Sequence, residues 1–122
     1  VFRNYNGSDI RVRFWNWWNR GYNNAFRMES SRSKSVGLGE NIRASLLEIR
    51  DSKPPPRFDV EGAEDSGNGS LMRMAPAAVF FHRDIRLTMQ VCAEQSFTTH
   101  PGPIAADACA FLGFLLASAI SR

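Results

Sequence analysis

The chain has 122 residues, of which 43% are hydrophobic and 22% charged, and its formal net charge is +3. This length fits one domain or part of one, and the composition is that of a globular protein rather than a disordered chain. The basic residues are spread along the sequence without a dense stripe, which argues against nucleic acid as a partner.

The two cysteines and the apolar runs bear on where the protein works. Cys92 and Cys109 lie among apolar residues without metal-ligand spacing, so we expect buried, reduced thiols in a cytoplasmic (intracellular) protein. The longest apolar run, residues 108–120, is shorter than the roughly 20 residues of a membrane span, and no signal peptide opens the sequence. We therefore expect no membrane partner. Because the chain starts at Val1 and ends just after an apolar stretch, we also expect a fragment of a longer protein.

Helical spacing of hydrophobic residues dominates the first part of the chain, and no segment alternates as a strand would. We predict a first helix over residues 9–20, capped by Ser8 or Asp9 and ended by Gly21. Its three tryptophans either pack against the core or form a stacking platform for nucleic acid. Packing is favoured, because two of them share the apolar stripe of the helix.

A second helix is predicted over residues 38–50, after a polar loop at residues 23–35. Gly37 and Gly39 resemble the start of a dinucleotide fingerprint, but no strand precedes them and the third glycine is missing. Residues 51–66 hold three prolines, and we predict an exposed connection there. The same segment carries a cluster of acidic residues that a solvated loop explains better than a cation site: Asp59, Glu61, Glu64 and Asp65.

Three further helices are predicted in the second half of the chain. The third follows a glycine-rich turn and either kinks or restarts at Pro76, and the fourth runs over residues 85–95 with Asp84 as its cap. The fifth covers residues 103–120 and is apolar nearly all round, as a helix in a protein interior is. Four amphipathic neighbours can barely surround such a helix. We therefore predict an all-α helical bundle, the central part of a larger fold, with residues 1–122 as a single partial domain.

The glycine-rich turn, Gly67-Asn68-Gly69-Ser70, is the first candidate ligand site. Glycines permit close approach and positive φ angles, and the helix start behind them adds unpaired N–H donors and a partial positive charge. These features suit a phosphate or the polar edge of a sugar. The alternative is an ordinary helix start that Ser70 caps.

The second candidate site is the loop Thr98-Thr99-His100-Pro101, which gathers two hydroxyls and an imidazole where the last helix begins. A histidine there can donate or accept a hydrogen bond near neutral pH. The alternative is a capping loop with a rigid entry into the helix. Neither candidate site provides a carboxylate pair or a metal-ligand set, so the catalytic residues are unknown and no metal ligand is predicted.

Three strings taken together resemble the ADP-ribosylglycohydrolase family, including the dinitrogenase-reductase-activating glycohydrolases. They are Gly-Asn-Gly-Ser-Leu-Met-Arg-Met-Ala-Pro at residues 67–76, Thr-Thr-His-Pro at residues 98–101, and Ala-Ala-Asp-Ala-Cys at residues 105–109. Their order and separation are similar to the middle section of that family. The tryptophan and glycine residues between positions 17 and 37 match the part before it.

The resemblance implies an all-α fold with two divalent cations, Mg²⁺ or Mn²⁺, that cleaves the bond linking ADP-ribose to a protein side chain or related acceptor. It implies that Gly67, Asn68, Gly69 and Ser70 line the ADP-ribose site and that His100 contacts the same ligand. The expected partner is an ADP-ribosylated protein or ADP-ribose conjugate. The linkage to the acceptor stays open, since arginine, serine and others are all compatible with these strings.

The sequence departs from the family pattern in what holds the metal. The Gly-Asp, Thr-Asp-Asp and Asp-x-Asp-Thr motifs that supply the family's metal ligands do not occur in it, and Phe97 stands where the family usually carries a small or polar residue. The leading hypothesis is therefore an ADP-ribosylglycohydrolase fragment that holds substrate and is inactive alone. The alternatives are a non-catalytic ADP-ribose or nucleotide-binding module and a helical RNA-associated protein.

Overall fold

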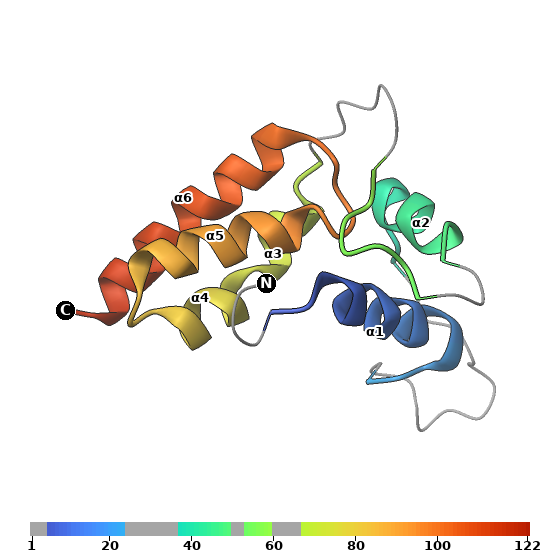
Figure 1. Cartoon of the computed structure of the whole chain (residues 1–122), viewed down its shortest axis with the longest axis horizontal. Coiled ribbons are helices and arrows are strands. Elements are labelled where there is room, and N and C mark those ends of the chain that lie inside the picture. The colour runs from blue at the N-terminus through green and yellow to red at the C-terminus, as the bar shows by residue number, and fades with distance from the viewer. Residues whose placement is uncertain (1–4, 24–36, 50–52, 60–66) are drawn as a thin grey trace.

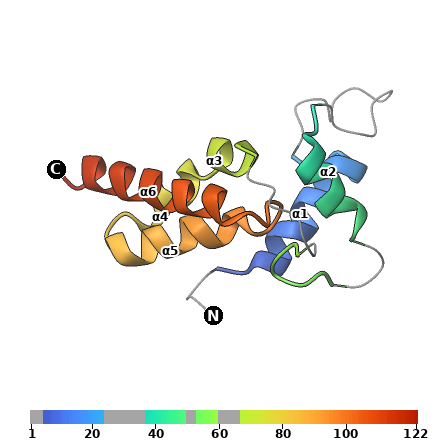
Figure 2. The same cartoon turned by 90° about the horizontal axis from the view of Figure 1, so that it is seen from above.

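The computed structural model describes residues 5–23, 37–49, 53–59 and 67–122. In these ranges the chain forms α1 (Gly7–Arg20), α2 (Glu40–Leu47), α3 (Gly69–Arg73), α4 (Ala75–Phe81), α5 (Ile85–Ser96) and α6 (Pro103–Ile120), with no strand among the described residues. The predicted all-α class is confirmed. Helices α3 to α6 form one group, and α1 and α2 lie together at its end (Figures 1 and 2).

Helix α1 begins two residues earlier than the sequence predicts. Asn6 has extended backbone (φ −141°, ψ 98°), and its side-chain oxygen accepts a hydrogen bond from the backbone N–H of Asp9 at 3.1 Å. Asn6 is therefore the N-cap, and the prediction of Ser8 or Asp9 is wrong because both already lie inside the first turn. The predicted end is confirmed, since Gly21 is left-handed at φ 68°.

Helix α2 is shorter than the predicted 38–50 at both ends. It starts after Gly39, whose backbone is extended, and ends at Leu47. Ile49 is nevertheless buried, so its apolar side chain contributes to the core from outside the helix. The predicted end of this helix is too late because it was placed from the apolar residues, and burial continues for two residues beyond the last helical residue.

The break predicted around Pro76 is a restart of the helix. Met74 separates α3 from α4, and Pro76 stands in the first turn of α4, where a missing backbone N–H removes no helical hydrogen bond. Met74 itself is 1% exposed and packs with Ala78, Cys92 and Cys109. The break thus points a long apolar side chain into the core.

Helices α5 and α6 form the best-packed part of the molecule and lie side by side in both views (Figures 1 and 2). Asp84 caps α5 as predicted by accepting from the N–H of Leu87 at 3.0 Å. Cys92 and Cys109 are buried free thiols, also as predicted. A Cβ on Gly113 would lie 2.7 Å from Cys92 Sγ, so the absence of a side chain there lets the two helices approach closely.

Helix α6 is apolar nearly all round, and, as expected for so few neighbouring helices, the described part of the chain does not cover all of it. The side facing α5 is buried, but the opposite side is open, with Ile104 69%, Phe111 61% and Leu115 45% exposed. The neighbouring helices cover one side only. By length and composition α6 could cross a membrane, with a mean hydropathy of 1.8 over 18 residues, but core helices of soluble proteins have the same properties.

Two sets of contacts join the α1–α2 group to the rest of the chain. The guanidinium of Arg11 is fully buried and donates to the carbonyls of Pro55 and Arg57, each at 3.0 Å, and to Ser45 O and the Glu48 carboxylate. This ties α1 to α2 and to residues 53–59.

The second set reaches the loop that follows α5. The Ser45 hydroxyl donates to Thr98 O at 2.9 Å, and the N–H of Phe58 donates to Phe97 O at 2.7 Å. Helix α2 is thereby fixed against one of the two predicted ligand loops.

Candidate functional site

The two predicted ligand loops meet the start of α2 around a cavity of about 290 Å³, which we call the glycine-loop pocket. Of the predicted site residues, Gly67, Asn68, Gly69 and His100 line it, and Ser70 does not. The described residues of its wall are Gly37, Gly39, Glu40, Asn41, Ile42, Gly67, Asn68, Gly69, Met72 and His100. Segments that are distant in the sequence thus form one concave surface.

The start of α2 is the wall that the sequence did not reveal. The sequence offered Gly37 and Gly39 as an incomplete dinucleotide fingerprint and Gly37 as part of the family resemblance, and it gave Glu40 and Asn41 no role. The available signal was a pair of glycines directly before a polar helix start. Such a signal is weak, because only the tertiary contact with the Thr98–Thr99–His100 loop brings it to the pocket.

Close approach is what requires glycine at positions 67 and 69. A Cβ on Gly69 would lie 3.0 Å from Cε1 and 3.1 Å from Nε2 of His100, and a Cβ on Gly67 would lie 3.0 Å from Asn41 Nδ2. Neither glycine has a positive φ angle, so the second reason expected from the sequence is wrong here. The imidazole therefore rests directly on the backbone of the glycine turn.

The tautomer of His100 follows from its neighbour. Thr99 and His100 are both buried, and Thr99 Oγ1 lies 2.7 Å from His100 Nδ1, the one hydrogen bond that the described residues give this hydroxyl. A buried hydroxyl is stable when its hydrogen is donated. The contact therefore favours Thr99 as the donor to Nδ1, an arrangement in which a neutral imidazole would carry its hydrogen on Nε2, on the side of the ring that faces Gly67 and Gly69.

Asn68 and Ser70 differ in where their side chains lie. Asn68 is exposed and is the N-cap residue of α3, but its side chain makes no capping hydrogen bond. Ser70 is fully buried inside the helix, and its hydroxyl accepts from Ser96 Oγ at 2.7 Å. The alternative in which Ser70 caps the helix is therefore wrong. Its hydroxyl joins α3 to α5, whereas the Asn68 amide stands at the pocket.

Arg73 fixes the loop of His100 to α3. Its Nε donates to Gln95 Oε1 at 2.9 Å, and its Nη2 donates to Gln95 O at 2.8 Å and to Thr98 Oγ1 at 3.0 Å. Burial lowers the pKa of Arg73 from 12.5 to about 10, so the guanidinium stays protonated at neutral pH. A buried cation thus holds the residue two positions before His100.

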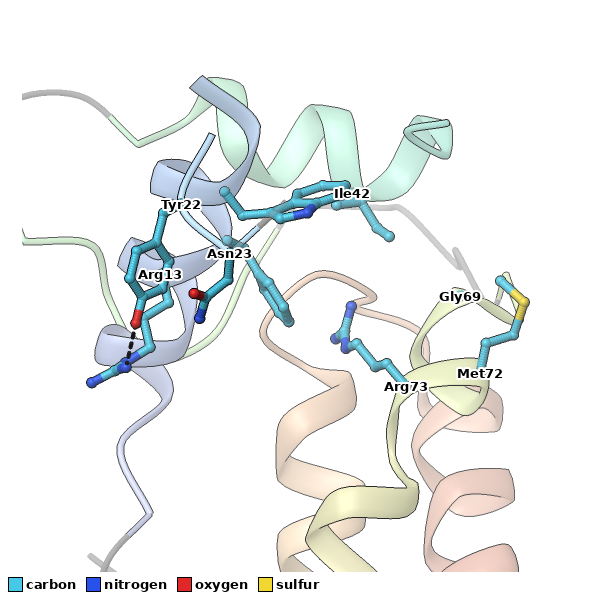
Figure 3. A pocket seen from close by; sticks show the side chains of 9 residues that line it. Arg13, Tyr22, Asn23, Ile42, Gly69, Met72 and Arg73 are labelled. Carbon is cyan, nitrogen blue, oxygen red and sulfur yellow. Dashed lines mark hydrogen bonds between the residues drawn. The ribbon is translucent and has the colours of Figure 1, made fainter. Parts of the chain in front are cut away.

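A larger cavity of about 470 Å³ lies between α1 and α3 (Figure 3). Arg73 extends into this space from α3, and across it Arg13 donates to the hydroxyl of Tyr22 at 3.2 Å. Its wall is mostly apolar and aromatic, made by Arg13, Phe14, Trp17, Tyr22, Asn23, Ile42, Gly69, Met72 and Arg73. The guanidinium of Arg73 stacks 4.9 Å from the centre of the Phe14 ring. Three wall residues, Ile42, Gly69 and Met72, are shared with the glycine-loop pocket.

A further cavity of about 450 Å³ is lined by Tyr5, Asn6, Gly7, Ser8, Lys53, Pro56 and Glu94 and contains none of the predicted site residues. The tryptophans and His82 line neither this cavity nor the glycine-loop pocket. All three tryptophans are half-buried, and Trp17 and Trp18 pack with ring centres 6.0 Å apart. His82 ends α4 with Nδ1 2.8 Å from Val79 O, in agreement with its lack of a catalytic assignment. Asp59 is exposed, while Glu61, Glu64 and Asp65 lie outside the described residues, as does most of the predicted 23–35 loop.

A divalent cation does not fit the residues that the structure describes. Mg²⁺ prefers several oxygen ligands, mainly carboxylates. Within the described ranges no three His, Cys, Asp or Glu side chains come together in a way that could hold a metal ion. The groups present at the glycine-loop pocket, two amides, an imidazole and a single carboxylate, are instead suited to hydrogen bonding with a ligand.

Comparison with known proteins assigns the chain to a family. The ADP-ribosylglycohydrolase family model matches residues 2–122, and the chain belongs to that family, whose members act on ADP-ribosylated substrates and are typically metal-dependent. ADP-ribosylarginine hydrolase Tri1 of Serratia proteamaculans (strain 568) is 28% identical over 107 residues, which are 88% of this chain and 27% of that protein. The chain thus spans about a quarter of this relative. No solved structure matches it significantly.

Proposed function

We propose that this chain forms the substrate-holding part of a hydrolase that cleaves the bond between ADP-ribose and a protein side chain. The observation that carries the proposal is the meeting of Gly67, Gly69 and His100 in one pocket, within a chain of the ADP-ribosylglycohydrolase family. The other cavity with several polar side chains, among them Asn6, Ser8 and Lys53, contains none of the predicted site residues.

The pocket offers donors that match the oxygen-rich surface of ADP-ribose. The exposed amide of Asn68 can donate to a phosphate or ribose oxygen, a charged acceptor makes such a hydrogen bond stronger, and the His100 ring lines the same pocket. The absence of side chains at Gly67 and Gly69 lets the Asn41 amide and the His100 ring lie against the glycine turn at the edge of the pocket. Holding the conjugate in one orientation is itself a contribution to catalysis, because it removes the entropy loss from the reactive step.

Arginine is the acceptor that we propose. The similar protein from Serratia proteamaculans is an ADP-ribosylarginine hydrolase. The conjugate would then carry a guanidinium next to the bond that is cleaved. A group able to bind that guanidinium should therefore lie beside the residues that hold the ADP-ribose.

Bond cleavage needs groups that the described residues do not provide. In a metal-dependent hydrolase the cation supplies an activated water or stabilises developing charge. The carboxylates needed to hold it are not gathered in the described part of the chain. We therefore propose that the 122-residue chain binds ADP-ribose without releasing it from arginine, and the same observation supports the alternative of a non-catalytic ADP-ribose-binding module.

Calorimetric titration of the chain with ADP-ribose tests the proposal. His100→Ala should weaken binding by about tenfold or more, since it removes a hydrogen bond to a charged group. His82→Ala is the matched control, because this histidine ends α4 and does not line the pocket, and it should bind as the unchanged chain does. Absence of ADP-ribose binding, or equal losses in both variants, would contradict the proposal.

A parallel assay separates the enzyme fragment from the binding module. Binding is measured with and without Mg²⁺, and release of ADP-ribose from ADP-ribosylarginine is followed in both conditions. Release by this chain alone would contradict its assignment as the substrate-holding part. A complete protein containing it that binds ADP-ribose but never releases it would favour the module.

A further inference from the structure

The glycine-loop pocket contains a carboxylate for which the sequence suggested no role. Glu40 is the first residue of α2 and is the one Asp or Glu among the described residues of the pocket wall. Its neighbour Asn41 has Nδ2 3.0 Å from the position that a Cβ on Gly67 would occupy. The start of α2 therefore lies against the glycine turn, and Glu40 lies at the edge of the predicted ADP-ribose site.

The carboxylate of Glu40 is accessible to a ligand. Its side chain is 81% exposed and accepts a hydrogen bond from Arg43 Nη1 at 3.3 Å, three residues further along the same helix. Exposed pairs of this kind contribute little to stability, so the Arg43 guanidinium can be displaced at small cost. The contact also shows that this carboxylate can accept a hydrogen bond from a guanidinium nitrogen.

The position in α2 keeps this carboxylate near the pocket. A negative charge in the first turn of a helix interacts favourably with its N-terminal end, and Gly39 offers no side-chain cap that would compete for this place. The hydrogen bond from Ser45 to Thr98 O then fixes the middle of α2 against the loop that carries His100. One short helix thus links a carboxylate to the donors that face the ligand.

We propose that Glu40 binds the guanidinium of the acceptor arginine and thereby selects arginine-linked ADP-ribose over conjugates with an uncharged linkage. The inference rests on the proposed function, because it needs ADP-ribose in the glycine-loop pocket. On binding, the acceptor guanidinium replaces that of Arg43 on the Glu40 carboxylate. Glu40 is a specificity residue in this role and takes no part in holding the ADP-ribose moiety.

Glu40→Gln tests the inference with three ligands: ADP-ribose, ADP-ribosylarginine and ADP-ribosylserine. The variant should weaken binding of ADP-ribosylarginine by roughly threefold to tenfold, as expected for one exposed charge pair, and leave the other two ligands unchanged. Asp107→Asn is the matched control, because it removes the same charge from an exposed position on α6 away from the pocket. It should change none of the three affinities.

A second variant makes the prediction independent of any effect on the stability of α2. Arg43→Gln removes the competing guanidinium and should strengthen ADP-ribosylarginine binding by about twofold to threefold. Equal weakening of all three ligands by Glu40→Gln, or no weakening of any, would overturn the inference while leaving the ADP-ribose site intact. If the unchanged chain binds none of the three ligands, the proposed function itself fails and the inference fails with it.

Discussion

The two cavities share a wall but differ in chemistry. The glycine-loop pocket, at about 290 Å³, presents an imidazole, two amides and a carboxylate, whereas the cavity between α1 and α3, at about 470 Å³, is lined mostly by aromatic and aliphatic side chains. In the larger cavity Arg13 pairs with Asp9 and Tyr22, and Arg73 binds Gln95 and Thr98 but keeps a buried Nη1 without a partner among the described residues. The comparison teaches that the placement of polar groups, more than cavity size, identifies the candidate ligand site.

The largest expected effect comes from the shared wall. Gly69→Val would place a branched side chain where even a Cβ lies 3.0 Å from the His100 ring, so the imidazole must move out of the pocket. We expect the affinity for ADP-ribose to fall by about 100-fold. Calorimetry checks this. Ala119→Val is the control, because Ala119 is exposed near the end of α6 and does not line the pocket. Retained binding in Gly69→Val would assign the ligand to another part of the molecule.

Arg73 gives the next largest effect, on stability. It extends into the larger cavity, but its hydrogen bonds hold Gln95 and Thr98. Arg73→Met should lower the free energy of unfolding by about 2–4 kcal/mol, because Gln95 Oε1 loses the donor that Arg73 supplies, whereas Gln95 O keeps its hydrogen bonds from Thr98. Urea unfolding measures the change. Arg13→Met is the control, since the Arg13 side chain is exposed and pairs with Asp9 on the surface.

The pH dependence of the Arg73 effect also has a definite sign. The pKa of Arg73 is lowered by burial to about 10 in the folded chain, against an ordinary value of 12.5. Between these two values the unfolded chain binds more protons at this site, so the contribution of Arg73 to stability rises with pH there. Below about pH 10 both states keep the proton, and the difference between the unchanged chain and Arg73→Met should be constant from pH 7 to 9. A steep change in that range would contradict the assigned protonation.

The smallest expected effect concerns the orientation of the His100 hydrogen. Thr99→Val removes the hydroxyl that donates to Nδ1 and should convert a single imidazole tautomer into a mixture, which the ¹⁵N chemical shifts of the ring report. Affinity for ADP-ribose should fall by roughly threefold to tenfold. Thr99→Ser keeps the hydroxyl and should restore both properties. An unchanged ring spectrum in Thr99→Val would show that another group sets the tautomer.

Local signals predicted the second half of the chain well. Asp84 and Pro103 mark the starts of α5 and α6, and both helices were predicted to within one residue. The error at α2 arose because Ile49 is buried without being helical. A capping side chain such as Asp84 bonds an N–H three residues away, so the sequence can indicate it, although for α1 it indicated Ser8 or Asp9 in place of Asn6. Burial also depends on distant parts of the chain.

The candidate site was also only partly predictable, because contacts between distant parts of the chain decide which side chains reach it. Gly67, Asn68, Gly69 and His100 were found from their strings, and the structure brings them together. No sequence pattern could show that Ser70 turns into the core toward Ser96, because this depends on how α3 packs against α5. Glu40 was missed because it is 60 residues away from His100 in the sequence, and the pocket exists only after the two groups of helices have packed.

The buried guanidinium of Arg11 has a consequence for the order in which the chain folds. Its hydrogen bonds join residues separated by 34 to 46 positions, so each requires closure of a long loop before it forms. Helices α5 and α6 are neighbours in the sequence and pack through local contacts, which generally form faster. We expect a helical hairpin of α5 and α6 to form first in refolding. The α1–α2 group should pack against it later, and the pocket is complete only then.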